Sequence, residues 1–305
     1  MLPKMPPRPG SLGFLYVPPY RIQGISVAGE QTVIQIPELD VCFDIGLCPR
    51  IALASPYIAL SHGHMDHLGG LPYYFSQRMF QRMGVGTCVC HPALEKPLLR
   101  MMQAWVDLEE QRTPHHVVGL APDDQMEIKN NIFLRAIAVS HTVPALGFAI
   151  IERRSKLKEE FHDLPQEKLR ELKSSGVEIT RTLEIPLVAY TGDTELGPFL
   201  YRDEFARAKI VISECTFFER DHKNRASVGK HLHIGDLASL LPAWEAEAVI
   251  LTHLSRRTNL VHAREHIAKH VPEEELPRVH VLMDHRANRL RYEAQTAAVN
   301  EHSAC

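Results

Sequence analysis

The sequence predicts a layered α/β fold, because short apolar runs typical of strands alternate along the chain with longer segments of helical spacing. The strand-like runs lie at residues 31–36, 39–43, 57–61, 132–140, 147–152, 187–190, 210–213 and 248–252. The segments with helical spacing lie at residues 71–83, 93–108, 164–172, 234–241 and 261–269. Polar residues that could bind metal recur at the ends of several apolar runs, and strand ends are where α/β folds build their sites.

Length and composition are those of an ordinary globular protein. The chain has 305 residues, of which 45% are hydrophobic and 23% are charged. A core of this size folds without the help of metal or disulfides, so a bound metal would serve chemistry. The net charge of −3 excludes attraction of nucleic acid to the whole surface but allows a local basic patch.

The domain organisation is predicted to be simple. Residues 1–20 carry six prolines and are expected to form an irregular N-terminal arm. Residues 21–288 form one catalytic domain, since no internal repeat or linker interrupts them, and residues 289–305 form a loose polar tail. The six scattered cysteines indicate free thiols in a reducing compartment, and neither a signal sequence nor a membrane span is evident. A cytoplasmic protein without membrane attachment is therefore expected.

The most informative segment follows the strand-like run 57–61, where four potential ligands fall within six residues. His62 and His64 are two residues apart in an extended loop, so their side chains point the same way and can bind one ion. Asp66 and His67 lie where the chain turns into a helix, so they diverge toward a second position. Imidazole and carboxylate ligands suit Zn²⁺, and also Mn²⁺ or Fe²⁺. The alternative, a chance cluster of surface histidines, fits poorly between a buried strand and a helix.

Three further candidates end other apolar runs. His141 follows residues 132–140, Asp193 follows residues 187–190, and His253 follows residues 248–252. Because strand ends converge on one edge of a sheet, we expect these side chains to meet the His62 loop.

The segment His62-Gly63-His64-Met65-Asp66-His67 resembles the HxHxDH signature of the metallo-β-lactamase superfamily, and His141, Asp193 and His253 match its later motifs in order. The resemblance implies an αββα four-layer sandwich, in which two mixed β-sheets are flanked by helices. It also implies two divalent metal ions, most simply Zn²⁺. One ion would be held by His62, His64 and His141, the other by Asp66, His67 and His253, with Asp193 as the bridge.

The resemblance also implies supporting and chemical roles. Asp44 matches the family's supporting aspartate, which would orient the histidine loop, although it could also be an ordinary turn residue. Two such ions lower the pKa of a shared water toward neutrality and neutralise charge on a phosphoryl or acyl oxygen. Asp66 would steer or deprotonate the nucleophile while it also binds metal. This chemistry fits hydrolysis and leaves the substrate open.

Residues 25–270 are more narrowly similar to short-form ribonuclease Z of the plant type. Two stretches discriminate this family from other members of the superfamily, namely Glu214-Cys215-Thr216-Phe217 and His231-Leu232-His233-Ile234. The similarity implies an endoribonuclease that removes the 3′ trailer from precursor tRNA and that forms a homodimer. Glu214 would support the site from just outside the metal ligands.

In that family a histidine before a short helix donates a proton to the leaving 3′ oxygen. His231 is the first candidate here and His233 the alternative. Positioned proton transfer contributes about 10²–10⁴-fold, because a ribose alkoxide leaves poorly without a proton. Either histidine could instead cap the helix or remain a neutral surface residue.

Basic residues near these motifs could contact RNA phosphates. The candidates are Arg256 and Arg257, after His253, and Lys223, Arg225 and Lys230, before His231. Another basic run begins at Arg153, but each run taken alone is more typical of a solvated face. Many ribonuclease Z proteins carry a long arm that grips tRNA, and the sequence between Gly70 and His141 has no obvious counterpart.

Two alternatives remain open at this stage. The first is another hydrolase of the same fold, such as a cyclic-nucleotide phosphodiesterase or a lactonase. The second is a non-catalytic RNA-binding protein, which fits less well because all seven ligand positions are retained.

Overall fold

Strands whose successive side chains are apolar on both faces build the centre of the molecule. In β12 (Ile210–Glu214), Ile210 and Ile212 face the core between the sheets, whereas Val211 faces a second core under helices. The next strand, β13 (Ala248–Thr252), alternates in the same way. Side chains of a strand point alternately to its two faces, so such continuous apolar runs require cover on both sides.

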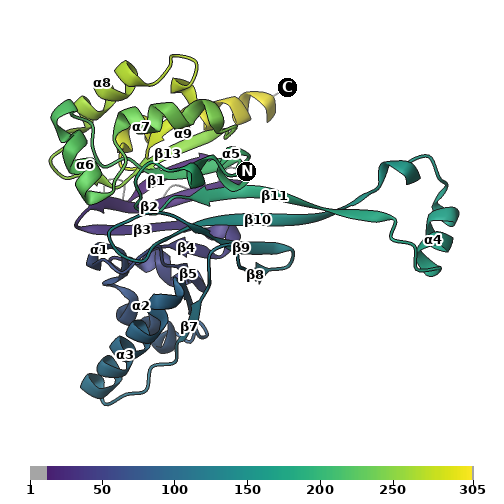
Figure 1. Ribbon diagram of the computed structural model, residues 1–305, viewed down its shortest axis with the longest axis horizontal. Coiled ribbons are helices and arrows are strands. Elements are labelled where there is room, and N and C mark those ends of the chain that lie inside the picture. The colour runs from purple at the N-terminus through teal and green to yellow at the C-terminus, as the bar shows by residue number, and fades with distance from the viewer. Residues whose placement is uncertain (1–11, 304–305) are drawn as a thin grey trace.

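That cover comes from a second sheet on one face and helices on the other, as the computed structural model of residues 12–303 shows (Figure 1). The first sheet contains β1 (Gly13–Val17), β2 (Tyr20–Ala28), β3 (Gln31–Ile36), β4 (Val41–Phe43), β5 (Tyr57–Ala59), β6 (Thr87–Cys90) and β7 (His116–Gly119), with β14 (Leu254–Ser255) beside β2. The second runs in the order β15 (Val279–Val281), β13, β12, β11 (Thr180–Tyr190), β10 (Leu146–Leu157), β9 (Ile132–Ala138) and β8 (Gln125–Lys129). Both sheets mix parallel and antiparallel pairs, which confirms the predicted αββα sandwich.

The helices divide between the two outer faces. One group packs its apolar side on β4, β5 and β6 around Tyr74 and Phe75, and it comprises α1 (Met65–Leu68), α2 (Leu71–Phe80) and α3 (Pro92–Glu109). The other group lies around Trp244 on the second sheet, and it comprises α5 (Asp203–Ala206), α6 (Lys223–Gly229), α7 (Ile234–Leu240) and α8 (Leu260–His270). Among residues 12–303, no helix has the length and hydropathy needed to cross a bilayer.

Both chain ends differ from the prediction. Within the stretch expected to be irregular, Gly13–Val17 forms β1, which pairs with β2 and buries Leu15 and Val17. The rest of that predicted arm, residues 1–11, lies outside the described residues. The tail expected to be loose continues a helix, α9 (His285–Ser303), and Tyr292 packs edge-on against Phe14 with ring centroids 5.6 Å apart. The helix α9 therefore packs against β1, which is itself paired with β2, and the local sequence of either segment does not show this contact.

A long arm projects from the body, and it comes from a part of the chain where none was predicted. Strands β10 and β11 continue past the sheet as an exposed antiparallel ribbon that ends in α4 (Gln166–Ser174) (Figure 1). Residues 154–183 are called the arm here. They lie between His141 and Asp193, whereas the sequence between Gly70 and His141 was predicted to hold no such arm. The prediction did not extend to the stretch that forms the arm.

Candidate active site

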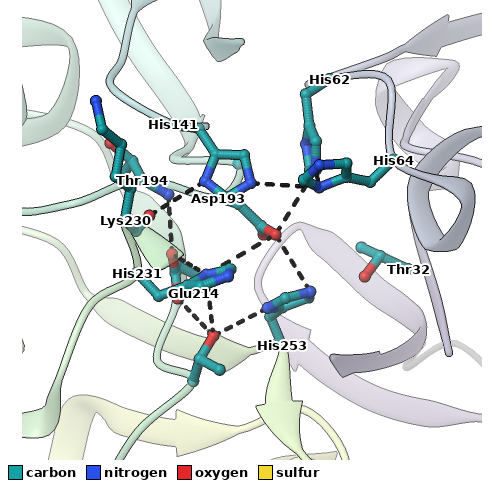
Figure 2. A network of polar contacts seen from close by, with 12 residues as sticks. Thr32, His62, His64, His141, Asp193, Thr194, Glu214, Lys230, His231 and His253 are labelled. Atoms are coloured by element: carbon teal, nitrogen blue, oxygen red, sulfur yellow. Dashed lines mark hydrogen bonds and ion pairs between the residues drawn. The ribbon is translucent and has the colours of Figure 1, made fainter. Parts of the chain in front are cut away.

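The loops after five strands meet at one edge of the sandwich. His62 and Asp44 follow the parallel strands β5 and β4 of the first sheet. His141, Asp193 and His253 follow β9, β11 and β13 of the second sheet. Figure 2 shows the side chains from both sheets pointing toward a common centre around Asp193. The structure therefore brings together the residues that sequence reasoning selected at strand ends.

The first group consists of three histidines, His62, His64 and His141. The Nδ1 atom of His64 lies 2.9 Å from Nε2 of His62 and 3.4 Å from Nε2 of His141. The three ring nitrogens all lie within 4.8 Å of one another. Three imidazole nitrogens directed at one point are a donor set for a divalent transition metal.

The second group consists of Asp66, His67 and His253. Nε2 of His67 lies 3.3 Å from Nε2 of His253, and the Asp66 carboxylate is 3.6 Å from the first ring and 3.4 Å from the second. The pKa of Asp66 is low: burial opposes this, but the hydrogen bond and charge of His253 and the charge of His67 outweigh it. The group therefore offers a carboxylate and two ring nitrogens to one cation.

Asp193 lies between the two groups. Its Oδ2 atom is 3.3 Å from Nε2 of His67, 3.2 Å from Nε2 of His253 and 3.8 Å from Nε2 of His62. Its other oxygen, Oδ1, is buried and has no hydrogen-bond partner within the described part of the chain. A buried carboxylate oxygen left without a partner is destabilising by about 1–3 kcal/mol or more, unless a cation binds it. The donor set and this oxygen both fit divalent metal ions.

Outer hydrogen bonds fix the direction of the rings. His67 bonds through Nδ1 to Oδ2 of Asp44 at 2.8 Å, and the same oxygen accepts the Tyr190 hydroxyl at 2.6 Å. Oδ1 of Asp44 accepts the backbone N–H of Ser61 at 2.6 Å, which holds the start of the histidine loop. Because Nδ1 is occupied, Nε2 of His67 faces the site. Asp44 thus lies where a supporting aspartate was predicted, and Tyr190 joins it from the opposite sheet.

Glu214 organises the other side of the site. Its Oε2 accepts the hydroxyl of Thr216 at 2.7 Å, and that hydroxyl lies 2.9 Å from Nδ1 of His253. Its Oε1 lies 2.9 Å from Nδ1 of His231 and accepts the backbone N–H of Thr194 at 2.8 Å. Thr216 was missed as a functional residue, although its place two residues after Glu214 puts both side chains on the same face of an extended chain.

His231 stands beside the metal-ligand groups. Its ring stacks on that of His253 with centroids 5.3 Å apart, and Nδ1 is 3.9 Å from Oδ2 of Asp193. Burial favours the neutral ring, but the carboxylates of Glu214 and Asp193 outweigh burial and raise the pKa of His231 to about 9. His231 therefore lies beside the candidate metal ligands with carboxylates that favour its protonated form.

The alternative candidate, His233, does not hold as a catalytic residue. Its Nδ1 accepts the backbone N–H of Gly235 at 3.0 Å, and its Nε2 lies 3.0 Å from the carbonyl oxygen of Glu219. Together with Asp236 it forms the N-terminal cap of α7. Both ring nitrogens are bonded to the backbone, so neither is available to a substrate.

The predicted RNA contacts lie at the surface next to the site, and two of them have partners in the protein. Arg256 pairs with Glu30 at 2.9 Å, and the ammonium of Lys230 lies 3.2 Å from Glu195. Arg225 stacks over the ring of Phe217 at 5.6 Å. The remaining candidates, Lys223 and Arg257, are exposed. A role in RNA binding stays a prediction for all five residues.

Comparison with known proteins identifies the family. Residues 53–254 match the family model described as the beta-lactamase superfamily domain. The chain is 31% identical over 253 residues to the chloroplastic tRNase Z TRZ2 of Arabidopsis thaliana, covering 82% of this chain and 72% of that one. It is also 31% identical over 242 residues to tRNase Z TRZ1 of the same plant, covering 78% and 86%. The chain belongs to the ribonuclease Z family.

Solved structures show the fold of this ribonuclease Z independently. The short form of human tRNase Z superimposes with a TM-score of 0.55 at 16% identity, covering 81% of this chain and 93% of that one. The metallo-β-lactamase fold protein YhfI of Bacillus subtilis gives a TM-score of 0.59 at 14% identity, covering 88% and 95%. The family and the donor set together imply that the protein binds divalent metal.

Proposed function

We propose that this ribonuclease Z is an endoribonuclease that hydrolyses the phosphodiester bond between a precursor tRNA and its 3′ trailer. One observation carries the proposal: His231, held by Glu214, stands against the metal-ligand groups (Figure 2). A site for ester hydrolysis that also contains a proton donor suits a substrate whose leaving group is a poor one. The relatives named tRNase Z or ribonuclease Z support tRNA as that substrate.

The proposal includes two metal ions, with Zn²⁺ favoured and Mn²⁺ or Fe²⁺ as alternatives. His62, His64 and His141 would hold one ion, and Asp66, His67 and His253 would hold the other, with Asp193 serving both. Bound ions would make hydroxide available near neutral pH and neutralise charge on the phosphoryl oxygens.

The protein's own side chains would do the positioning and the proton transfer. Asp66 stays ionised, so it can accept a hydrogen bond from the attacking water and orient it. Asp44 and Thr216 keep the rings of His67 and His253 turned so that Nε2 faces the site. His231 would donate its proton to the departing 3′ oxygen, and Glu214 would stabilise the charged ring before that transfer.

The arm would bind the body of the tRNA. Six residues of β10 beyond Ile151 extend about 20 Å at roughly 3.3 Å per residue, and α4 lies farther out. Lys156, Arg170 and Lys173 are exposed there, and none has a carboxylate within ion-pair distance in the described residues. Cations held away from the site fit phosphates that lie far from the cleaved bond.

A homodimer is also part of the proposal. Large apolar side chains on α2 and α3 are exposed, including Phe80 at 62%, Trp105 at 43% and Leu108 at 74%. Where such exposed side chains form one patch, they are typical of a protein interface. The double variant Trp105→Asp/Leu108→Asp should run as a monomer in light scattering, while Val261→Asp on α8 should not change the mass. A monomeric wild type would remove this part of the proposal.

The decisive test compares two substrates. Purified protein should cleave a precursor tRNA at one position, giving a mature 3′ end, and a chelator should abolish the cleavage. Bis(p-nitrophenyl) phosphate reports the hydrolytic centre alone. Hydrolysis of the small ester without cleavage of any precursor would contradict the tRNA assignment and favour another hydrolase of this fold.

A further inference from the structure

Three loops place His141, Asp193 and His231 at the site. Each loop also carries one polar residue close to the site residue, and these three polar residues contact one another. Ser140 precedes His141, Lys230 precedes His231, and Glu195 lies two residues after Asp193. The Ser140 hydroxyl donates to Oε1 of Glu195 at 2.5 Å. The Lys230 ammonium lies 3.2 Å from that oxygen and donates to the Ser140 hydroxyl at 3.0 Å. The three side chains therefore close a triangle across the three loops.

The backbone repeats the same connections. Glu195 donates its N–H to the carbonyl of Ser140 at 3.0 Å. The carbonyl of Lys230 lies 3.2 Å from Nδ1 of His141 (Figure 2). Lys230 therefore contacts Glu195 through its side chain and His141 through its backbone. Lys230 also has a left-handed conformation, with φ at 51°, directly after α6. A left-handed residue is common where a helix ends, and here it turns the chain from α6 toward His231.

The backbone N–H of His231 bonds to the carbonyl of Ala226 at 2.9 Å, and Lys230 joins this end of α6 to Ser140 and Glu195. The His231 ring is anchored at one end by Glu214, and its backbone follows the residue that the triangle holds. A proton donor contributes to the rate only when it is held within hydrogen-bond reach of the leaving atom, and displacement by about 1 Å can cost a hundredfold.

We propose that Ser140, Glu195 and Lys230 form a positioning clip that holds His231 against the leaving 3′ oxygen. This inference rests on the proposed function. In this proposal Lys230 has a structural role and does not bind an RNA phosphate, because its ammonium contacts Glu195 and Ser140. The clip acts through His231 and does not itself touch the reacting atoms.

The experiment uses the variants Lys230→Met, Glu195→Gln and their double combination, each assayed on two precursors. One precursor has the natural 3′ oxygen at the cleaved bond, and the other has a bridging 3′ sulfur, which leaves as a thiolate without needing a proton. On the oxygen substrate each single variant should lower kcat about tenfold with KM within about twofold. The double variant should be no slower than the singles, because one unit is broken in all three.

The sulfur substrate separates positioning of the acid from other defects. Both single variants should cleave it within about twofold of the wild-type rate, since proton donation no longer limits the reaction. Lys209→Met is the matched control: Lys209 pairs with Glu247 at 3.2 Å, but at the opposite ends of the strands β12 and β13. It should equal the wild type on both substrates. A defect that persists on the sulfur substrate would overturn the clip.

The rival role for Lys230, a direct contact to RNA phosphate, predicts a different pattern. Lys230→Met would then raise KM and reduce the salt dependence by about one unit of slope, and Glu195→Gln, which frees the ammonium, would not lower kcat. That result would also refute the proposal.

Hydrogen exchange in the metal-free protein provides a readout that does not depend on activity. Amides of residues 226–233 should exchange faster in Lys230→Met and Glu195→Gln than in the wild type or Lys209→Met. Unchanged exchange there would contradict the clip, whereas a wild type that cleaves no precursor would contradict the proposed function alone.

Discussion

The edge of the sandwich that carries the site and the arm that leaves it are built in opposite ways. At the edge, Asp44, Asp193 and Glu214 are buried, and nearly every ring nitrogen has a fixed partner. In the arm, α4 has no buried residue, and its ion pairs, such as Lys168 with Glu171, are exposed. Segments with little buried surface open and adapt at low free-energy cost. The candidate site therefore sits on a rigid support, and the arm that is proposed to contact the substrate can adapt.

The largest expected effect comes from breaking the rigid region at a metal ligand. His64→Ala should lose bound metal and at least about a thousandfold of the activity together, because one of three ring nitrogens in its group disappears. Metal analysis and precursor cleavage check both losses on the same sample. His262→Ala, on the exposed surface of α8, serves as the control. Normal metal content in His64→Ala would contradict its assignment as a ligand.

The next largest effect is expected from a substitution in the same region that leaves the proposed metal ligands in place. His231→Ala should slow turnover by about 10²–10⁴-fold while metal content stays near that of the wild type, because only the proton donor is removed. Single-turnover cleavage with metal analysis measures both quantities. Release of metal by this variant would show that His231 is a ligand and that its proposed role is wrong.

Removing the arm should affect recognition and spare chemistry. Arg154 and Leu183 face each other across the ribbon, so residues 155–182 can be replaced by an Asn-Gly turn between them. The ratio kcat/KM for precursor tRNA should fall roughly 10- to 100-fold through lost phosphate contacts. Hydrolysis of bis(p-nitrophenyl) phosphate should stay near the wild-type rate. Equal losses on both substrates would mean that the arm supports the site itself.

A single charge in the arm should have the smallest effect. Arg170→Ala should raise KM for precursor tRNA about two- to fivefold and reduce the slope of log affinity against log salt by about one. Binding measured between low and physiological salt provides both values. Lys209→Met, which removes one cation outside the arm, should leave the slope unchanged. If both variants lower the slope equally, the effect is one of net charge and not of an arm contact.

The sequence predicted much of the fold because its strands are short, apolar and followed by distinctive residues. The strands β12 and β13 were expected at nearly the residues where they occur. The apolar pattern failed to predict segments that are ordered by contact with a distant part of the chain. The strand β1 is held by pairing with β2, and α9 packs against it, as in the contact of Phe14 with Tyr292. A polar helix without a strong apolar stripe gives little signal alone. The sequence did not predict the ribbon of the arm, because the exposed half of the ribbon is charged and lacks the apolar run of a buried strand.

For this protein the sequence by itself selected the candidate metal ligands, because the spacing from His62 to His67 and the strand ends at His141, Asp193 and His253 fix which residue types arrive at one edge. Only the tertiary structure decided between His231 and His233. Two residues apart, they are equivalent in sequence, but Glu214 bonds the first ring while Glu219 and the start of α7 bond the second. Lys230 likewise became part of the protein's own network only when folding brought Glu195 beside it. The direction of a polar side chain is set by partners that lie far away along the chain, and local patterns do not contain them.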